Sequence, residues 1–325
     1  MICSSSSRTA LLSPVPVAQH RIWSVMVITS IGWGTSGVLT RVAFAEGMEP
    51  FAVVAISSAI AAVAVVAYAT AVRHGFAVGA TGWRIGAIMS VLSVTIPFLS
   101  RNLALENASA GFVGLASALV PLATAATAHF VLADEPFDRT TIGGLLVALA
   151  GVAVLVFSGD AGIGEEGRPL LAGFFSLLGV VSVAVGSVFA KRHAGEYSPL
   201  AVAGVQFVLG AVITTLLMLL IEGVPAAPTA KAWGSLGYVA IVSTFVPVVL
   251  YYWLLRHVTV TYSSVIGYVI PLIAVVVGIV VLDEQLQPGI VVGGILILAG
   301  VVMTDRARIR RAAAPTGNEV PPVAV

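Results

Sequence analysis

Leu132-Ala133-Asp134-Glu135 separates two apolar runs of the chain, and the similar stretch Leu282-Asp283-Glu284 separates two others. The acidic pairs lie 149 residues apart, and further rare or conformationally restricted residues recur at a spacing of 149 or 150. These further pairs are Gly37 with Gly186, Pro50 with Pro199, Trp83 with Trp233, Pro97 with Pro247, Pro121 with Pro271, Gly144 with Gly293 and Gly151 with Gly300. Such a recurrence predicts two related halves of about 150 residues each.

The composition is that of a membrane protein. Hydrophobic residues make up 58% of the 325 residues, charged residues make up 10%, and the mean hydropathy is +1.05. A soluble domain needs a more highly charged surface than this. The net charge is only +1, so the sequence offers no large basic face and we expect no nucleic-acid partner. The single cysteine, Cys3, cannot form an internal disulfide.

Ten apolar runs are long enough to cross a bilayer, which needs roughly 20 residues per helix. They span residues 22–44, 50–72, 83–104, 107–131, 139–158, 169–190, 199–221, 233–255, 258–281 and 288–305. Only Glu106-Asn107 and Arg256-His257 separate two of the neighbouring pairs, which must therefore be antiparallel hairpins. The expected fold is an all-α integral membrane protein with ten transmembrane helices.

Five helices per half place the two halves in opposite orientations. Twelve Lys and Arg residues fall on the side of the N-terminus, against Arg41, Arg101, Arg168 and Lys231 on the other side. The positive-inside rule then predicts that both termini are cytoplasmic. Two inverted-topology repeats of this kind are typical of secondary transporters, which work by alternating access.

The predicted organisation has five parts. They are a disordered cytoplasmic N-terminus (1–21), a first five-helix repeat (22–158), an inter-repeat loop (159–168), a second five-helix repeat (169–305) and a basic, disordered cytoplasmic tail (306–325).

Several short motifs resemble the EamA branch of the drug/metabolite transporter superfamily. They are Gly32-Trp33-Gly34, the stretch 104–110 with Pro121-Leu122 after it, Asp134-Glu135 with Gly144, Ala150 and Gly151 after it, and Pro271-Leu272 with Asp283-Glu284, Gly293 and Gly300. The resemblance implies a ten-helix carrier of a bacterial inner membrane. Such carriers often export amino acids or other small metabolites through a cavity between two five-helix bundles.

Polar and aromatic residues within the predicted helices are candidates for the substrate cavity. They are Trp33, Thr95, Arg101, Asn102, Ser182, Gln206, Thr244, Tyr251 and Tyr268. Trp33 lies too deep for an interfacial aromatic, so it either packs in the core or forms a cavity wall. Arg101 either extends to the outer surface or pairs with a substrate carboxylate or an acid such as Glu106, because a lone buried cation is costly. Tyr251 either anchors the helix at the membrane interface or lines the cavity. The remaining mid-span polar residues either face the cavity or join helices by hydrogen bonds, and they are Thr95, Ser182, Gln206, Thr244 and Tyr268.

Matched prolines and glycines have structural interpretations as well. Pro97, Pro121, Pro247 and Pro271 each remove a backbone hydrogen bond within a predicted helix, which predicts kinks that shape the cavity or, alternatively, simple curvature. The glycines of the fifth and tenth helices predict close helix packing, with a homodimer contact as the alternative.

Three titratable residues are candidate gates or proton sites: Glu135, Glu284 and His129. The two acids precede the fifth and tenth helices, where they are expected to complement the positive end of those helix dipoles. A role as gates at the mouths of the cavity is the alternative. His129 either relays protons or makes a packing hydrogen bond.

The sequence lacks a His-Glu-x-x-His metal motif, a phosphate-binding loop and a glycine-flanked serine nucleophile. We therefore expect no cofactor and no enzymatic activity. The partners we expect are a small metabolite and the lipid bilayer. The favoured function is a gradient-driven exporter, and the alternative is a non-transporting scaffold or sensor.

Overall fold

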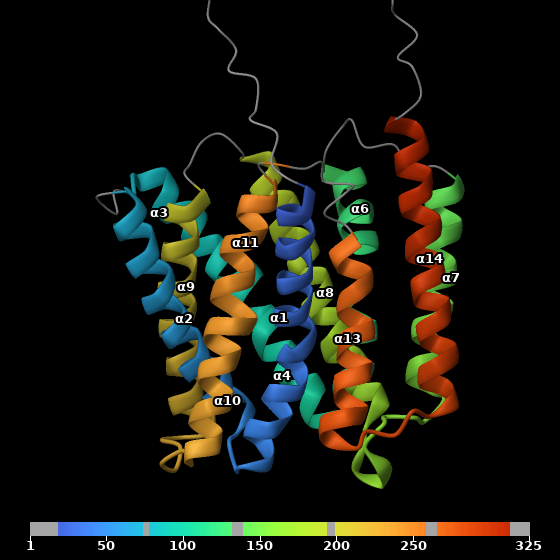
Figure 1. Ribbon diagram of the computed structural model, residues 1–325, viewed down its shortest axis with the longest axis horizontal. Coiled ribbons are helices and arrows are strands. Elements are labelled where there is room, and N and C mark those ends of the chain that lie inside the picture. Colours follow the sequence, from blue (N-terminus) through green and yellow to red (C-terminus); the bar gives the residue numbers. More distant parts are fainter. Residues whose placement is uncertain are drawn as a thin grey trace, which may run out of the picture.

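A computed structural model describes residues 19–73, 78–131, 139–193, 199–255, 257 and 265–312. Within these ranges the chain is helical with short connections and contains no strand, which confirms the all-helical prediction. The helices stand side by side in one bundle (Figure 1). Helix α1 begins and helix α14 ends at the same end of this bundle, the top of the figure.

The helical elements follow one another with few breaks. In chain order they are α1 (Gln19–Ala45), α2 (Pro50–Arg73), α3 (Ala80–Met89), η1 (Ser90–Thr95), α4 (Ile96–Asn107), α5 (Ala110–Ser117), α6 (Val120–Val131), α7 (Arg139–Phe157), η2 (Gly164–Glu166), α8 (Pro169–Arg192), α9 (Pro199–Ile221), α10 (Ala230–Ala240), η3 (Ile241–Phe245), α11 (Val246–Leu255), α13 (Val265–Leu282) and α14 (Pro288–Ala312). Eight helical stretches of the described chain are long and apolar enough to cross a membrane. Two shorter apolar helices, Ile266–Leu282 and Pro288–Thr304, accompany them.

Two of the predicted helices contain a widened turn. Segments η1 and η3 are π-helical, so the N–H of Ile96 donates to Val91 O and the N–H of Val246 donates to Ile241 O, five residues back. Pro97 and Pro247 follow immediately. Because proline lacks an N–H and its ring crowds the preceding turn, a wider turn relieves the conflict without ending the helix.

The other two matched prolines differ from this pair and from each other. Helix α5 ends at Ser117 and α6 begins at Val120, so Pro121 lies in the first turn of a new helix, where its missing N–H costs nothing. Pro271 lies inside the continuous helix α13. The proline repeat in the sequence therefore corresponds to three different backbone arrangements.

Helix α1 lies in the middle of the bundle (Figure 1). Its glycines permit close approach on different sides. A Cβ on Gly32 would collide with Val242 O of η3, and a Cβ on Gly34 would lie 2.7 Å from the side chain of Ile273 on α13. Small residues let helices approach closely in a membrane. The Gly32-Trp33-Gly34 motif therefore fixes α1 against two neighbouring elements.

Helices α7 and α14 form a tight pair at one edge of the bundle (Figure 1). A Cβ on Gly151 would lie 2.7 Å from Gly293 O, and a Cβ on Gly293 would lie 2.8 Å from Gly151 O. A Cβ on Gly144 would lie 2.6 Å from Gly300 O. The backbones of the two helices touch at these positions, which confirms the predicted packing role of the glycines.

Candidate functional site

Arg101 on α4 is the centre of a polar site within the bundle. Its Nη1 donates to Ser36 Oγ on α1 at 2.7 Å, and Ser36 Oγ donates in turn to Trp33 O at 2.7 Å. The guanidinium lies 5.8 Å from the centre of the Phe98 ring. Its Nε is buried and has no hydrogen-bond partner among the described residues. The alternative in which Glu106 pairs with Arg101 is not observed, and the Glu106 side chain is exposed.

Other buried polar groups also lack a hydrogen-bond partner in the part of the chain that the structure describes. Asn102 is 2% exposed, and its Nδ2 donates to Phe98 O at 2.8 Å while its Oδ1 accepts no hydrogen bond from the described chain. The hydroxyl groups in the same condition belong to Thr29, Thr40, Ser58, Thr95, Ser176 and Ser243. Buried polar groups of proteins are normally satisfied, so such a group marks a place where water or a ligand is expected to bind.

Two of the three aromatic candidates lie together. The rings of Trp33 on α1 and Tyr251 on α11 are 5.5 Å apart and tilted by 58°. Both are partly buried against the apolar cluster of Met26, Leu254 and Ile266. The structure thus brings two sequence candidates into contact, and Trp33 O also accepts the Ser36 hydroxyl that holds Arg101.

Ser182 and Thr244 are bound to the widened turns. Ser182 Oγ on α8 donates to Leu92 O of η1 at 2.8 Å, and Thr244 Oγ1 donates to Val239 O, five residues earlier in its own helix, also at 2.8 Å. These hydroxyls therefore satisfy carbonyls at or beside the π turns. For Ser182 this is the helix-to-helix hydrogen bond that the sequence offered as the alternative to a cavity role.

The remaining candidates lie elsewhere. Gln206 is buried on α9, Tyr268 is partly buried on α13 against the largest apolar cluster, and His129 is exposed in the last turn of α6, 5.4 Å from the ring of Phe130. None of the three hydrogen-bonds to Arg101, whose partner is Ser36. Glu135 lies outside the described residues.

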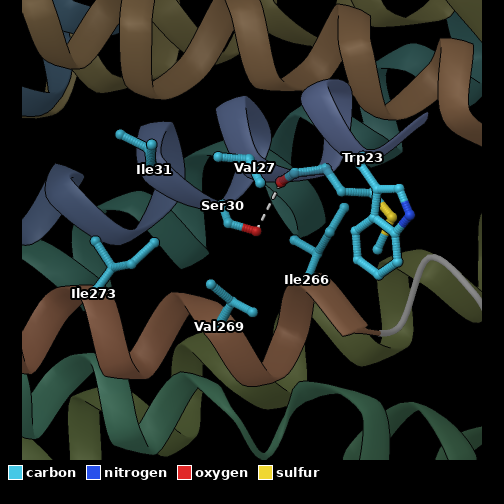
Figure 2. A pocket seen from close by; sticks show the side chains of 8 residues that line it. Trp23, Val27, Ser30, Ile31, Ile266, Val269 and Ile273 are labelled. Carbon is cyan, nitrogen blue, oxygen red and sulfur yellow. Dashed lines mark hydrogen bonds between the residues drawn. The ribbon is translucent and has the colours of Figure 1, made fainter. Parts of the chain in front are cut away.

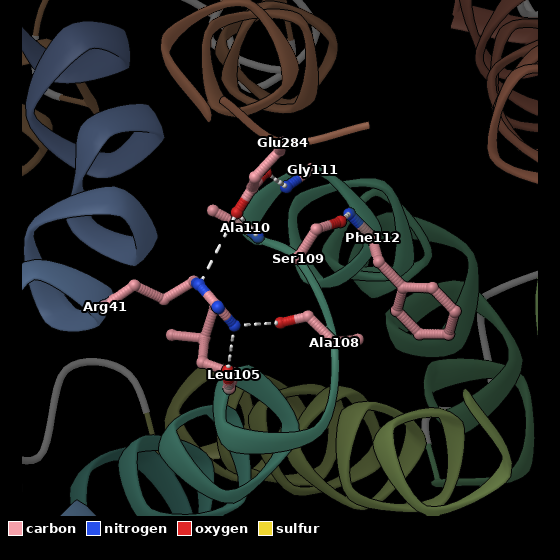
Figure 3. A network of polar contacts seen from close by, with 8 residues as sticks. All are labelled: Arg41, Leu105, Ala108, Ser109, Ala110, Gly111, Phe112 and Glu284. Carbon is pink, nitrogen blue, oxygen red and sulfur yellow. Dashed lines mark hydrogen bonds and ion pairs between the residues drawn. The ribbon is translucent and has the colours of Figure 1, made fainter. Parts of the chain in front are cut away.

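A second polar constellation, which we call the hairpin clamp, joins Arg41 and Glu284 across the break between α4 and α5 (Figure 3). Arg41 Nη1 donates to Leu105 O at 2.8 Å and to Ala108 O at 3.0 Å, so it caps the C-terminal end of α4. Glu284 accepts the N–H groups of Ala110 at 2.7 Å and Gly111 at 3.2 Å, so it caps the N-terminal end of α5.

The two caps are also an ion pair. Arg41 Nε lies 3.7 Å from Glu284 Oε1 (Figure 3). Burial raises the pKa of Glu284 above its ordinary value, although the N–H groups of Ala110 and Gly111 and the Arg41 charge oppose this effect. The clamp therefore places a partly desolvated acid between α1, the α4–α5 hairpin and the connection after α13.

The helix that Glu284 caps was wrongly assigned from the sequence. The sequence favoured α14, the helix that follows Glu284 in the chain. The structure places Glu284 on α5 instead, and the N–H of Gly289 in the first turn of α14 donates to Asp160 Oδ2 at 2.7 Å. The connection between α13 and α14 brings Glu284 back beneath Gly278, where Glu284 N donates to Gly278 O at 3.3 Å.

Further contacts close the same end of the bundle. Ser109 N donates to Ala161 O and Arg168 N donates to Asn107 O, each at 2.8 Å. Glu222, after α9, accepts the N–H groups of Phe51 and Ala52 in the first turn of α2, each at 2.8 Å. Connections of both halves of the chain are thereby tied to each other at the end shown at the bottom of Figure 1.

A shallow hollow lies between α1 and α13 (Figure 2). Its lining residues are Trp23, Met26, Val27, Ser30, Ile31, Ile266, Val269 and Ile273. The hydroxyl of Ser30 donates to Met26 O, so the hollow presents no unsatisfied polar group from Ser30. Val27 is 52% exposed. The lining of this hollow is mostly apolar, so it offers few of the polar groups that fix a ligand.

No group of three His, Cys, Asp or Glu side chains that could hold a metal ion occurs in the described ranges. A bundle of helices that are long and apolar enough to cross a membrane, with a partly buried cation inside it, defines a multi-pass helical membrane protein. The chain belongs to the EamA-like transporter family, whose model matches residues 21–157 and 170–304. The resemblance seen in the sequence is thereby confirmed.

Similar proteins are named as transporters. The chain is 28% identical over 304 residues to a probable terminal-alkyne amino-acid exporter of Streptantibioticus cattleyicolor, covering 89% of this chain and 95% of that one. It is 25% identical to the uncharacterized transporter YoaV of Bacillus subtilis, covering 59% of this chain and 65% of the relative. It is 26% identical to the uncharacterized inner membrane transporter YedA of Escherichia coli, covering 53% and 54%.

A solved crystal structure shares the fold. It aligns with a TM-score of 0.62 at 18% sequence identity and covers 91% of this chain and 100% of that one. The family and the names of these relatives indicate transporters, which are not enzymes.

Proposed function

We propose that the protein is a secondary transporter of the inner membrane that exports an amino acid or a similar small metabolite by alternating access, driven by an ion gradient. In this proposal ten transmembrane helices form two inverted five-helix repeats, and both termini are cytoplasmic. The observation that carries the proposal is the exchange of equivalent contacts between the halves, which involves α1, α8 and the two π turns.

Each half places its first helix on the π turn of the other half. Gly32 on α1 touches Val242 O of η3, and Ser182 on α8 hydrogen-bonds Leu92 O of η1. Residues 32 and 182 are 150 apart in the sequence, and so are residues 92 and 242. Equivalent contacts of this kind are expected when two related halves pack about a twofold axis, as in inverted-repeat transporters.

The orientation of the helices supports the same architecture. In Figure 1, α1 begins at the top of the bundle, and the connection that leads into α8 lies at the bottom. The first helix of each half therefore starts from a different side. With the positive-inside rule, the top of the figure is the cytoplasmic side and the hairpin clamp lies at the outer end.

The clamp fits the role of an outer gate. Arg41 and the α4–α5 hairpin belong to the first half and Glu284 belongs to the second, so Glu284 must leave both Arg41 and the hairpin if the halves part at this end. Glu284 is the acid that joins the two halves in the clamp, and burial raises its pKa, so it is our proposed proton-sensitive group of the gate. Glu135 is the repeat counterpart of Glu284, and we propose it as the corresponding residue of the cytoplasmic gate.

The direction of transport rests on the relatives. The protein of Streptantibioticus cattleyicolor is named a probable exporter of an amino acid, and its match extends over most of both chains. The alternative is a non-transporting scaffold or sensor. A protein of that kind has no need of two gates, or of a partly buried cation such as Arg101 that has no counter-ion among the described residues.

Transport is tested with purified protein in liposomes. Labelled amino acids and related small metabolites are screened for movement under an imposed pH gradient, with protein-free liposomes as the control. We expect gradient-dependent flux of at least one compound, and flux of none would favour the scaffold.

The membrane orientation is tested by labelling single cysteines in intact cells. Because Cys3 is the single cysteine of the sequence, Cys3→Ser gives a cysteine-free background. Val224→Cys, at a position that is 83% exposed after α9, should react with a membrane-impermeant maleimide added outside. Arg192→Cys, at the other end of the bundle, should react only after permeabilisation. The opposite pattern would place the clamp in the cytoplasm.

A further inference from the structure

The charge of Arg101 has no counter-ion in the described part of the chain. The ion pairs found there are Arg41 with Glu284 and Lys231 with Glu46, and both lie near helix ends. Arg101 instead lies inside the stretch Ala80–Asn107, which is long and apolar enough to cross a membrane. A guanidinium is charged at any physiological pH, and an uncompensated charge within a bilayer is costly. A bound anion that neutralises the charge of Arg101 during part of the transport cycle would offset this cost.

The hydrogen bonds of Arg101 leave one edge of the guanidinium free. Nη1 is fixed by Ser36 Oγ, whose own proton goes to Trp33 O, so the Ser36 oxygen is held as an acceptor. Nε is buried without a partner among the described residues. A guanidinium presents its donors as a planar fork that matches the two oxygens of a carboxylate. The arrangement holds the cation in place and leaves donors for a planar anion.

An aromatic ring covers the guanidinium from one side. The Phe98 ring lies 5.8 Å from Arg101 Cζ and is itself 6.4 Å from the Phe207 ring of α9. This contact restricts the plane of the guanidinium, which favours approach of a ligand along its edge over approach on that face. The apolar cluster around Phe98 and Phe207 contains Ala61, Ala203 and Ala211, whose small side chains lie on α2 and α9.

We propose, building on the transporter function above, that Arg101 binds the carboxylate of the transported molecule and that substrates are therefore small organic carboxylates, zwitterionic amino acids included. Ser36 is a positioning residue that holds Nη1. Binding supplies the missing counter-ion, so the site is most stable when it is occupied.

Transport kinetics test the proposal with Arg101→Gln and Arg101→Lys. For the compound that the wild type moves fastest, Arg101→Gln should raise KM at least about 30-fold, the range found when one partner of a buried charge pair is removed. Arg101→Lys keeps the charge but loses the planar fork of donors, so its KM should lie between those of the wild type and Arg101→Gln. The wild type should discriminate against the carboxamide of the same compound, and Arg101→Gln should not. An unchanged KM in Arg101→Gln, or equal wild-type transport of acid and amide, would overturn the proposal.

Thermal unfolding in detergent separates ligand binding from a structural role. Without ligand, Arg101→Gln should unfold at the same or a higher temperature than the wild type, because it removes an uncompensated charge, whereas a structural residue would lower the midpoint. The probes are L-leucine, L-leucinamide and 3-methylbutylamine, together with a panel of other amino acids and their amides. Carboxylates should stabilise the wild type and not Arg101→Gln.

The two assays distinguish this proposal from the transporter function. Carboxylate-specific stabilisation that is lost in Arg101→Gln, without flux in liposomes, would support the site and contradict the transport function. Flux with neither carboxylate selectivity nor dependence on Arg101 would contradict the site alone. Absence of both flux and stabilisation would contradict both.

Discussion

Replacement of Glu284 by alanine should open the outer end of the bundle. The carboxylate of Glu284 accepts two backbone N–H groups of α5 and lies 3.7 Å from Arg41 Nε. Its side chain is only 5% exposed, so water cannot readily replace these contacts, whereas that of Arg41 is 23% exposed and can regain part of its hydration. Alanine would leave the N–H groups of Ala110 and Gly111 and the guanidinium of Arg41 without the carboxylate of Glu284.

The size of the effect follows from these contacts. Removal of an N-cap typically costs about 0.5–2 kcal/mol, and a hydrogen bond to a charged group contributes about 1.5–3 kcal/mol. Because these contacts share one carboxylate, their free energies are not simply additive. We take about 3 kcal/mol for the loss of all of them together. If the contacts exist only in the outward-closed state, the population of the open state should rise on the order of 100-fold, since each 1.4 kcal/mol is a factor of ten.

The open state can be measured by cysteine accessibility. Thr40 lies on α1, is 0% exposed, and its Oγ1 has no partner among the described residues, so Thr40→Cys in the Cys3→Ser background is a mild probe. A membrane-impermeant maleimide added outside intact cells should label Thr40→Cys slowly. Glu284→Ala should accelerate this labelling on the order of 100-fold, in line with the rise in the open state. The matched control is Glu46→Ala, because the Glu46–Lys231 pair lies at the same end and Lys231 is 68% exposed. Equal labelling rates with and without Glu284→Ala would refute a gating role for the clamp.

Three further outcomes can be measured by thermal unfolding in detergent. The pKa of Glu284 is raised in the folded protein, so folding favours its protonated form. The wild type should therefore gain stability relative to Glu284→Gln as the pH falls through the raised pKa, and lose this stability as the pH rises. A stability difference between the two proteins that does not change with pH would contradict the pKa shift. Gly151→Ala should cost about 1–3 kcal/mol by overpacking against α14, whereas Gly234→Ala, with open space around it, should be tolerated. Thr244→Val should cost about 1 kcal/mol through the lost hydrogen bond at η3, and an unchanged midpoint would show that this bond is dispensable.

Features that depend on periodicity and residue size could be predicted from the sequence. Long apolar runs predicted the helices because backbone groups in a bilayer must be satisfied within their own segment. The glycines at 144, 151, 293 and 300 predicted close packing because only a missing side chain permits backbone contact, and α7 and α14 pack in this way. The family could also be recognised, because its motifs consist of the same restrictive residues.

Features that depend on which segments meet in space could not be predicted. Glu284 was assigned to the following helix because helix dipoles are local in sequence, but the partner it caps is 174 residues away. Arg41 was counted only as one of the four positive charges on the outer side, and its position near the end of an apolar helix was the one available signal of a structural role. The π turns had a local signal in Pro97 and Pro247, but the same residue at 121 and 271 gives other structures.

Helix α4 connects the two polar constellations. It carries Arg101, and its last carbonyls are those that Arg41 caps. A carboxylate bound to Arg101 and the release of the clamp therefore act on the same short helix, which predicts a coupling between them. Coupling between two sites is reciprocal for binding free energies.

If the substrate binds more tightly to the outward-open state, Glu284→Ala should increase substrate affinity. The largest increase equals the factor by which saturating substrate promotes opening, and it is reached when the open state becomes dominant in the variant. The measurement combines Thr40→Cys labelling, with and without substrate, and substrate binding by thermal shift, each in wild-type and Glu284→Ala backgrounds. An affinity gain larger than that factor, or a labelling rate that the substrate leaves unchanged, would mean that the substrate does not act through the clamp. In Arg101→Gln the substrate should no longer change the labelling rate, although Glu284→Ala should still increase it, because the clamp contacts do not involve Arg101.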